Sequence, residues 1–374
     1  APFKFPLLST LVLLYFLVKR KKSFFLKEAT SKLMILFLIE IVIWVPFAKN
    51  NFHAFRIAEN MTLTFITVFS IILAVNNIKN LKILIRTWIL IQTLSAVWVI
   101  THGGKGPGGF VKDENDICAM LVMALPFSFY MAMEIRGRFK IWFLYSLSLL
   151  IIIIAIIMTS SRGGFLGLIA AILIMVWLSE KRLRNVVILL AISFSFAGAM
   201  VSFLPDSYVN EMKTISDKGD GTRNLRFLHW TTAIEIYKDN PVFGVGASNY
   251  PWHSGDYFYL SSYFVEGARI RSGRVSHSLY FTLIPELGTV GIILFFFIIL
   301  KPVRKLSEII KSNHLVLEAR YIKNLAKAML ASMGGFLVSA AFISVLYYPM
   351  LWHLIGFVLI LDKIYRSLLR TAPS

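Results

Sequence analysis

The sequence predicts an all-α polytopic integral membrane protein with about 11–12 transmembrane helices and one large loop that contains short helices. Of the 374 residues, 57% are hydrophobic and only 16% are charged, a balance that excludes an ordinary soluble domain. Apolar runs of roughly 15 to 24 residues recur along the chain, enough to cross a hydrocarbon core of ~30 Å. The runs are continuous rather than alternating, which argues against a β-barrel.

The basic excess of the chain reports membrane topology rather than nucleic-acid binding. The net charge is +19, but the basic residues cluster in short loops after apolar runs, as at Lys19–Lys22 and Lys301–Lys305. Such clusters are the positive-inside signal of membrane proteins. The long polar segment 205–276 holds eight basic and eight acidic residues and is therefore near neutral. We expect a lipid bilayer and no nucleic acid among the partners.

Eleven apolar spans are predicted, and the short basic loops between them fit one alternating topology. The spans are 5–18, 33–48, 61–76, 83–101, 117–134, 141–158, 163–179, 186–204, 277–300, 326–346 and 350–362. The first span must run from the outer to the inner side. We therefore expect a further helix before it, or a trimmed start, with twelve spans as the natural complete form.

The predicted organisation has three parts. Transmembrane helices 1–8 occupy residues 1–204, a large outer loop occupies 205–276, and the C-terminal transmembrane helices occupy 277–374. Cys118 is the only cysteine. This excludes an intrachain disulfide and a cysteine-based metal site.

The segments 49–60, 102–116, 160–162 and 347–349 are expected on the same outer side as the large loop. The loop at 102–116 is rich in glycine, which suits close backbone approach to a ligand or to another loop. It also contains three acidic residues, Asp113, Glu114 and Asp116. They lack a glycine-centred calcium pattern, so we interpret them as solvated.

Inside the large loop, Thr222 is expected to cap a helix from about residue 223 to residue 237, before Pro241. Arg226 and Trp230 are four residues apart and share one helix face. Another, apolar face is expected to lie on the membrane surface; it contains Leu225, Leu228, Ala233 and Ile236. For the helix as a whole we favour a structural amphipathic role. Gly244 and Gly246 give an open turn but no dinucleotide fingerprint.

Three residues in or next to the predicted spans, Arg162, His277 and Glu286, can each be interpreted in more than one way. Arg162 is either an arginine that binds lipid headgroups or a phosphate clamp, since a guanidinium offers paired donors and a permanent charge. His277 either satisfies an interfacial hydrogen bond or accepts a proton from a hydroxyl near neutral pH. Glu286 lies nine residues further on, on the opposite helix face. We therefore favour a structural hydrogen bond for Glu286.

Four segments together resemble the O-antigen ligase and polymerase superfamily of bacterial membrane glycosyltransferases. The segments are FVKDENDICAMLVMALP (110–126), SSRGGFLGL (160–168), Arg226-x-x-x-Trp230 followed by NPVFGVGASNY (240–250), and HSLYFTLIPELGTVGI (277–292). The resemblance covers roughly residues 100–300. The chain departs from the family at Ser278, where Asn is usual. The N-terminal third matches only in hydropathy.

The resemblance implies a multi-pass protein of the bacterial inner (cytoplasmic) membrane that acts in lipopolysaccharide biosynthesis with its active site facing the periplasm. It implies transfer of a glycan from undecaprenyl diphosphate to a hydroxyl of lipid A-core. The reaction is expected to be metal-independent, inverting and free of cofactors. A polysaccharide polymerase or a protein O-glycosylation ligase of the same superfamily is the alternative, and a lipid-linked sugar transporter is a further one.

The resemblance also assigns roles to individual residues. It implies that Arg162 and Arg226 bind the diphosphate. It implies that His277 deprotonates the acceptor or orients the leaving group. Trp230, Glu286 and Asn115 are the candidates for supporting positions.

Overall fold

A computed structural model describes residues 11, 15, 27–135, 138–180, 221–266, 273–313 and 318–371. These residues form helices joined by turns, and no strand occurs among them. The span predicted at 186–204 and nearly all of that at 5–18 lie outside the described residues. Within the described part, seven helices are long and apolar enough to cross a membrane. The prediction of an all-α polytopic membrane protein is confirmed.

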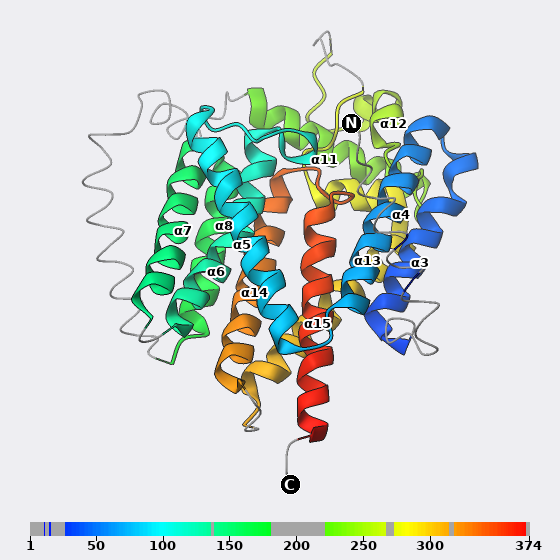
Figure 1. Ribbon diagram of the computed structural model, residues 1–374. Helices are drawn as coiled ribbons and strands as arrows, with labels where there is room; N and C mark the ends of the chain where they lie inside the picture. Colours follow the sequence, from blue (N-terminus) through cyan, green and yellow to red (C-terminus); the bar gives the residue numbers. More distant parts are fainter. Residues whose placement is uncertain are drawn as a thin grey trace.

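Nine helices of the described part form the bundle in Figure 1. They are α3 (Ala29–Ile43), α4 (Asn51–Ala74), α5 (Ile78–Thr101), α6 (Glu114–Glu134), α7 (Phe139–Met158), α8 (Arg162–Trp177), α13 (Leu279–Lys311), α14 (Ala319–Ser339) and α15 (Pro349–Thr371). The first five, α13 and α14 are the seven candidate spans. Helix α8 is apolar but shorter.

The core is centred on α15, which packs against α4, α13 and α14. Trp352 of α15 is fully buried. Its ring lies 5.3 Å from that of Phe37 on α3, 5.1 Å from that of Phe65 on α4 and 6.4 Å from that of Phe295 on α13. Aromatic pairs at these distances add packing energy beyond the area they bury. One side chain thus joins four helices.

Two predicted loops are largely helical. The expected outer loop 49–60 is mostly the first part of α4, where the Asn50 side chain accepts a hydrogen bond from the His53 amide (3.0 Å) and caps the helix. Likewise, α13 continues to Lys311 through the basic cluster that was expected to be an inner loop. Hydropathy locates apolar residues, whereas a helix continues past them wherever its backbone stays hydrogen-bonded.

The described part of the large loop lies across one end of the bundle (Figure 1). It forms α11 (Gly221–Asp239), α12 (Tyr250–Tyr257) and the 3-10 turn η4 (Phe258–Leu260). The capping role predicted for Thr222 depends on a side chain that lies outside the described part of the structure. The predicted helix itself is confirmed within two residues at each end.

The apolar face of α11 packs inward rather than onto the membrane surface. Leu228, Ala233 and Ile236 are buried. Ala233 and Ile236 form a small core with Val245 and Tyr250 of the same loop. Since hydropathy does not distinguish a lipid surface from a protein surface, the prediction of a membrane-lying face was wrong for these three side chains.

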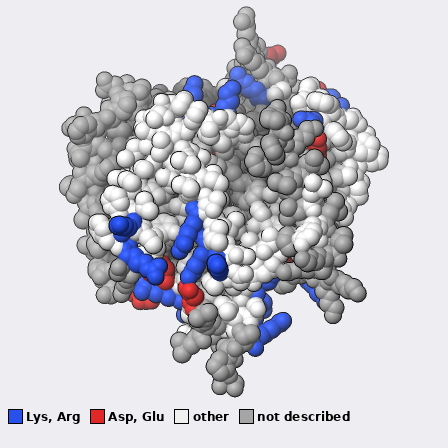
Figure 2. All heavy atoms as spheres, in the orientation of Figure 1, with Lys and Arg blue, Asp and Glu red and all other residues white. Residues whose placement is uncertain are grey.

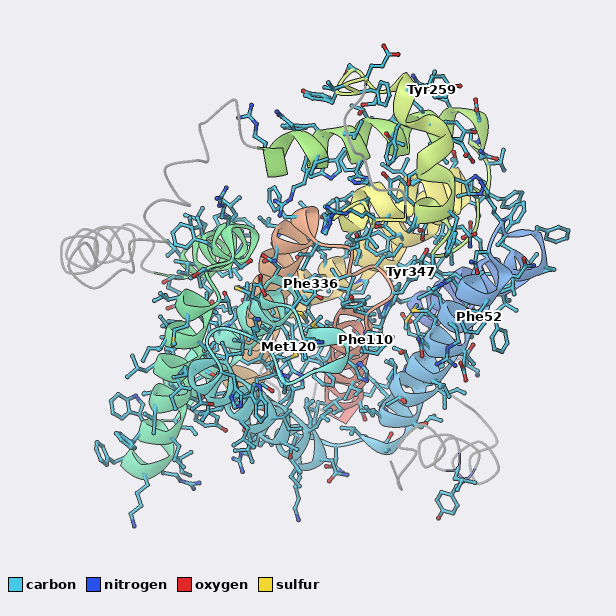
Figure 3. All side chains as sticks on the ribbon, turned by 90° about the horizontal axis from the view of Figure 1, so that it is seen from above. Phe52, Phe110, Met120, Tyr259, Phe336 and Tyr347 are labelled. Atoms are coloured by element: carbon cyan, nitrogen blue, oxygen red, sulfur yellow. The ribbon has the colours of Figure 1, made fainter. Side chains whose placement is uncertain are left out.

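Helix α13 is interrupted at the place where the large loop binds to the bundle. Gly288 has φ 58° and ψ −158° within the helix, a conformation that is essentially restricted to glycine. The helix therefore opens around this residue. Figure 3 shows the same end of the molecule from above, with Tyr347 near the centre and Tyr259 at the outer edge.

The turn Pro241–Gly246 fills the break with four backbone hydrogen bonds. The amides of Val245 and Gly246 donate to the carbonyls of Pro285 and Glu286, both at 2.9 Å. In the opposite direction, the amides of residues 289 and 290 donate to the carbonyls of residues 241 and 242, at 2.8 and 3.0 Å. A Cβ on Gly244 would lie 2.5 Å from the Pro285 oxygen. The glycine is required by this close approach.

Charged side chains on the face shown in Figure 2 gather in its upper and lower parts, with uncharged residues between them. The lower group corresponds to the end opposite α11. There Lys82 pairs with Glu318 at 2.6 Å and Arg320 with Glu134 at 3.3 Å. An uncharged band between two charged ends is the pattern of a membrane-spanning bundle.

Candidate active site

His277 stands where the large loop enters α13. The residue is exposed and has φ 52°, an uncommon conformation for a residue other than glycine. Its neighbours are held firmly: the Ser276 hydroxyl donates to the Ser278 carbonyl at 3.0 Å, and the Ser278 side chain accepts from the Phe281 amide at 3.4 Å. Ser278 is thus the N-cap of α13. It supplies the cap at the position where the family usually has Asn.

Trp230 fixes α11 against the start of α13. Its indole N–H donates to the Ser276 carbonyl at 3.1 Å. Its ring stacks on Phe281 of α13 with centroids 4.9 Å apart and planes 12° apart. Arg226 lies one turn earlier on the same face of α11 and is half-buried. The arginine is therefore carried on a helix that is pinned next to His277.

The electrostatic surroundings keep His277 neutral. The residue is exposed as a whole, yet desolvation of its ring is the largest cause that lowers its pKa below 6.5. The positive charges of Arg226 and Arg274 lower the pKa further, and the negative charge of Asp113 opposes them. At neutral pH the imidazole is unprotonated and able to accept a proton.

A second histidine, His229, has a structural environment. It is 3% exposed, and burial, followed by the charges of His277 and Arg274, lowers its pKa to about 4. Its Nδ1 lies 2.8 Å from the Tyr250 hydroxyl, which donates to the His229 carbonyl at 2.9 Å. These contacts join α11 to α12.

Arg162 begins α8 at the same end of the bundle. The preceding Ser161 caps the helix by accepting from the Gly164 amide at 3.1 Å, and its hydroxyl donates to the Asn115 side-chain oxygen at 2.7 Å. The Asn115 side chain in turn donates to Asp113 at 3.0 Å. Asn115 therefore joins the starts of α6 and α8, and this junction sets the position of Arg162.

Phe342 links this junction to α11. A Cβ on Gly163, next to Arg162, would lie 2.8 Å from the Phe342 Cβ, so the start of α8 packs directly on Phe342. The Trp230 ring lies 6.4 Å from the Phe342 ring. The structure thus brings together, at one end of the bundle, the segments that carry Arg162, Arg226, His277, Trp230 and Asn115.

Glu286 is close to the site but has its own partners. It is 2% exposed and accepts hydrogen bonds from the Ser248 amide (2.7 Å), the Tyr250 amide (3.0 Å) and the Tyr347 hydroxyl (2.8 Å). The expectation of a structural hydrogen bond at this residue is confirmed. It holds the segment after the 241–246 turn against α13.

Two residues of this region were not selected from the sequence. Arg274 influences the pKa of His277 from three residues away, and the short segment Arg274-x-x-His277 was the signal that could have indicated it. Tyr348 hydrogen-bonds to Asp116, and burial, followed by the charge of Asp116, raises its pKa to about 12. Asp116 thus has a protein partner, contrary to the interpretation of a solvated acid.

Comparison with known proteins agrees with this arrangement. Residues 147–296 match the family model described as O-antigen ligase. The match covers α8, α11, the 241–246 turn and the first half of α13, and therefore includes Arg162, Arg226 and His277. No curated protein matches the chain. The match supports the resemblance of the chain to the O-antigen ligase superfamily, whose general activity is glycosyl transfer of the ligase or polymerase type.

Proposed function

We propose that the protein transfers a glycan from undecaprenyl diphosphate to a hydroxyl of lipid A-core at the periplasmic face of the bacterial inner membrane. The observation that carries the proposal is geometric: Trp230 bonds to the Ser276 carbonyl and stacks on Phe281, and so holds the helix of Arg226 beside His277. A base and permanent positive charges in one place are the two requirements for displacing a diphosphate with a sugar hydroxyl.

In the proposed reaction, the acceptor hydroxyl oxygen attacks the anomeric carbon of the donor sugar. The bond between that carbon and the diphosphate oxygen breaks, and the electron pair leaves with the diphosphate. The hydroxyl proton passes to the imidazole of His277. A single displacement inverts the configuration at the anomeric carbon and requires neither a metal nor a cofactor in this scheme.

Arg226 and Arg162 would bind the diphosphate. The leaving group gains negative charge as its bond to the sugar breaks, and fixed guanidinium groups stabilise that charge without reorganisation. Their planar paired donors match phosphate oxygens. Trp230 and Asn115 would act as positioning residues, because Trp230 fixes the helix of Arg226 and Asn115 fixes the start of the helix of Arg162.

The decisive experiment incubates the purified full chain in lipid nanodiscs with a lipid-diphosphate-linked glycan and lipid A-core. A glycan on lipid A-core supports the ligase. A lengthened lipid-linked glycan indicates a polymerase instead. Movement of the lipid-linked glycan across a reconstituted bilayer without a new glycosidic bond indicates a transporter.

His277→Ala and Arg226→Ala variants are expected to fold and to lose at least about 100-fold of the transfer rate, the usual scale for a missing acid–base group or charge-stabilising donor. Lys238→Ala is the matched control, since Lys238 is exposed at the far end of α11 and pairs with the half-buried Glu235. Unchanged transfer by His277→Ala would remove the proposed base.

A further inference from the structure

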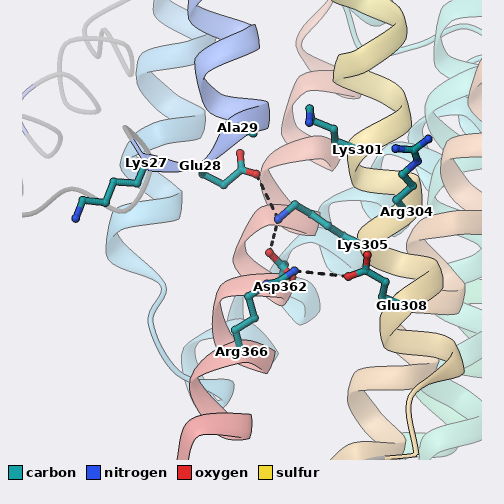
Figure 4. Close-up of a pocket in the computed structure, with 9 residues that line it drawn as sticks. All are labelled: Lys27, Glu28, Ala29, Lys301, Arg304, Lys305, Glu308, Asp362 and Arg366. Atoms are coloured by element: carbon teal, nitrogen blue, oxygen red, sulfur yellow. Dashed lines mark hydrogen bonds and ion pairs between the residues drawn. The ribbon is translucent and has the colours of Figure 1, made fainter.

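A polar cavity lies at the end of the bundle opposite α11, between α3, α13 and α15 (Figure 4). Its volume is about 380 Å³. At its base, Lys305 forms ion pairs with Glu28 (3.3 Å) and Asp362, and Arg366 bonds to Asp362 at 2.8 Å. Glu28 and Asp362 are only 8% and 2% exposed. The floor of the cavity is thus a fixed network of ion pairs.

The charges of the lining do not balance. Five basic and three acidic side chains line the cavity, so two positive charges remain. Each acid already has a basic partner, including Glu308, which lies 3.6 Å from Arg366. Within the described part of the chain, neither Lys301 nor Arg304 has an acidic partner. Among the described residues Lys27 has no acidic partner either, so Lys305 and Arg366 share the three acids and three lining cations are left. Two of these three, Lys301 and Arg304, lie on α13.

Lys301 and Arg304 lie at the end of an exposed apolar track. On α13, Ile293, Phe297 and Lys301 follow one another at intervals of four residues and therefore share one face. Ile293 is 50% exposed and Phe297 40% exposed. Figure 4 shows Lys301 extending from α13 toward the start of α3. An apolar stripe that ends in cations matches a molecule with an apolar tail and an anionic head.

Helix α3 presents a second apolar track to the same cavity. Ala29 at its start lines the cavity, and Leu36 and Ile43 follow at intervals of seven residues on the same face. These two side chains are 49% and 58% exposed. The tracks on α3 and α13 both lead along membrane-spanning helices from the cavity toward the other end of the bundle.

We propose that this cavity binds the phosphate group of an anionic phospholipid. Lys301 and Arg304 would neutralise the phosphate, and the acyl chains would lie against the exposed residues of α13 and α3. Basic pockets between transmembrane helices are a known means of holding such headgroups. A free phosphate ion offers the same charge, but it would leave the two apolar tracks unused. The proposal is independent of the glycosyl-transfer site.

The test measures lipid binding to the delipidated full chain in a neutral detergent by native mass spectrometry. Phosphatidylglycerol is compared with phosphatidylcholine and with inorganic phosphate. Both lipids carry a phosphate, but the choline group of phosphatidylcholine adds a cation that Lys301 and Arg304 repel. We therefore expect phosphatidylglycerol to bind at least about tenfold more tightly than phosphatidylcholine. Lys301→Gln combined with Arg304→Gln should abolish this preference.

The matched control is Lys311→Gln, which removes one exposed cation from the last turn of the same helix. It should leave the preference intact, and a Lys301→Arg variant should retain it. Equal binding of the two lipids, or an equal loss in the Lys311→Gln control, would overturn the proposal. Saturation of the same site by inorganic phosphate would overturn the assignment to a lipid. If the double variant fails to fold, the single Lys301→Gln variant supplies the comparison.

Discussion

Replacing Glu286 by alanine tests whether this buried carboxylate is structural. The change removes an acceptor for three donors, the amides of Ser248 and Tyr250 and the hydroxyl of Tyr347. Each buried donor left without a partner costs about 1–3 kcal/mol. The lower limits alone amount to a loss of about 3 kcal/mol in the free energy of unfolding.

Glutamine at the same position should cost less. Its amide oxygen can replace Oε2, which serves Ser248 and Tyr347, but its NH2 group would then face the Tyr250 amide, which is also a donor. One interaction is lost rather than three, so about 1–3 kcal/mol is expected. The order of stability is therefore wild type, then Glu286→Gln, then Glu286→Ala.

The assay is denaturant unfolding of the purified full chain in detergent micelles, followed by circular dichroism. Glu235→Ala serves as the control because Glu235 forms an exposed ion pair on α11, and such pairs contribute about 1 kcal/mol or less. Wild-type stability in Glu286→Ala would refute the structural role. A Glu286→Gln variant with full stability but no glycan transfer would refute it as well, and would point to chemistry at this residue.

Three further predictions concern the site and its supports. Arg274→Gln removes a cation that lowers the pKa of His277, so the acid limb of the transfer rate between about pH 5 and 8 should move to higher pH; a shift to lower pH, or none, contradicts the electrostatic account. Asn115→Ala should cost about 1 kcal/mol in unfolding experiments by removing the acceptor of the Ser161 hydroxyl, and Asn115→Asp should restore it. Gly288→Ala should lower the free energy of unfolding by about 1–3 kcal/mol through backbone strain alone. Gly334→Ala, whose Cβ would meet only the flexible end of Ile174, should lower it less. Equal stabilities of the two variants would exclude the strain.

The sequence predicted the transmembrane helices better than their ends. Apolar runs locate the bilayer-facing part of a helix, so the described spans were found. The ends of α4 and α13 were missed because polar and charged residues continue those helices beyond the apolar region. The break in α13 lies at Gly288, whereas Pro285 stays within the helix. The break depends on a partner segment more than 40 residues away, which local propensity does not contain.

For the site, spacing alone correctly placed Arg226 and Trp230 on one helix face. What spacing does not provide is tertiary proximity. The junction of Asn115 with Ser161, and the packing of Gly163 on Phe342, join segments that lie far apart in the sequence. The pattern of basic loops predicted that Arg162 and Arg226 lie on the same side of the membrane, but only the folded structure shows which side chains connect their segments. The catalytic roles of these residues remain predictions.

The paired backbone between the 241–246 turn and α13 limits how a bulky lipid-linked glycan can enter. Lifting the turn away would break four hydrogen bonds, and at about 1 kcal/mol each the open form would amount to roughly one molecule in a thousand. This part of the loop is therefore expected to stay in place against α13 rather than to open. If the proposed function holds, a lipid-linked substrate would enter from the bilayer beside this segment, and whichever of donor and acceptor blocks that path would have to bind second.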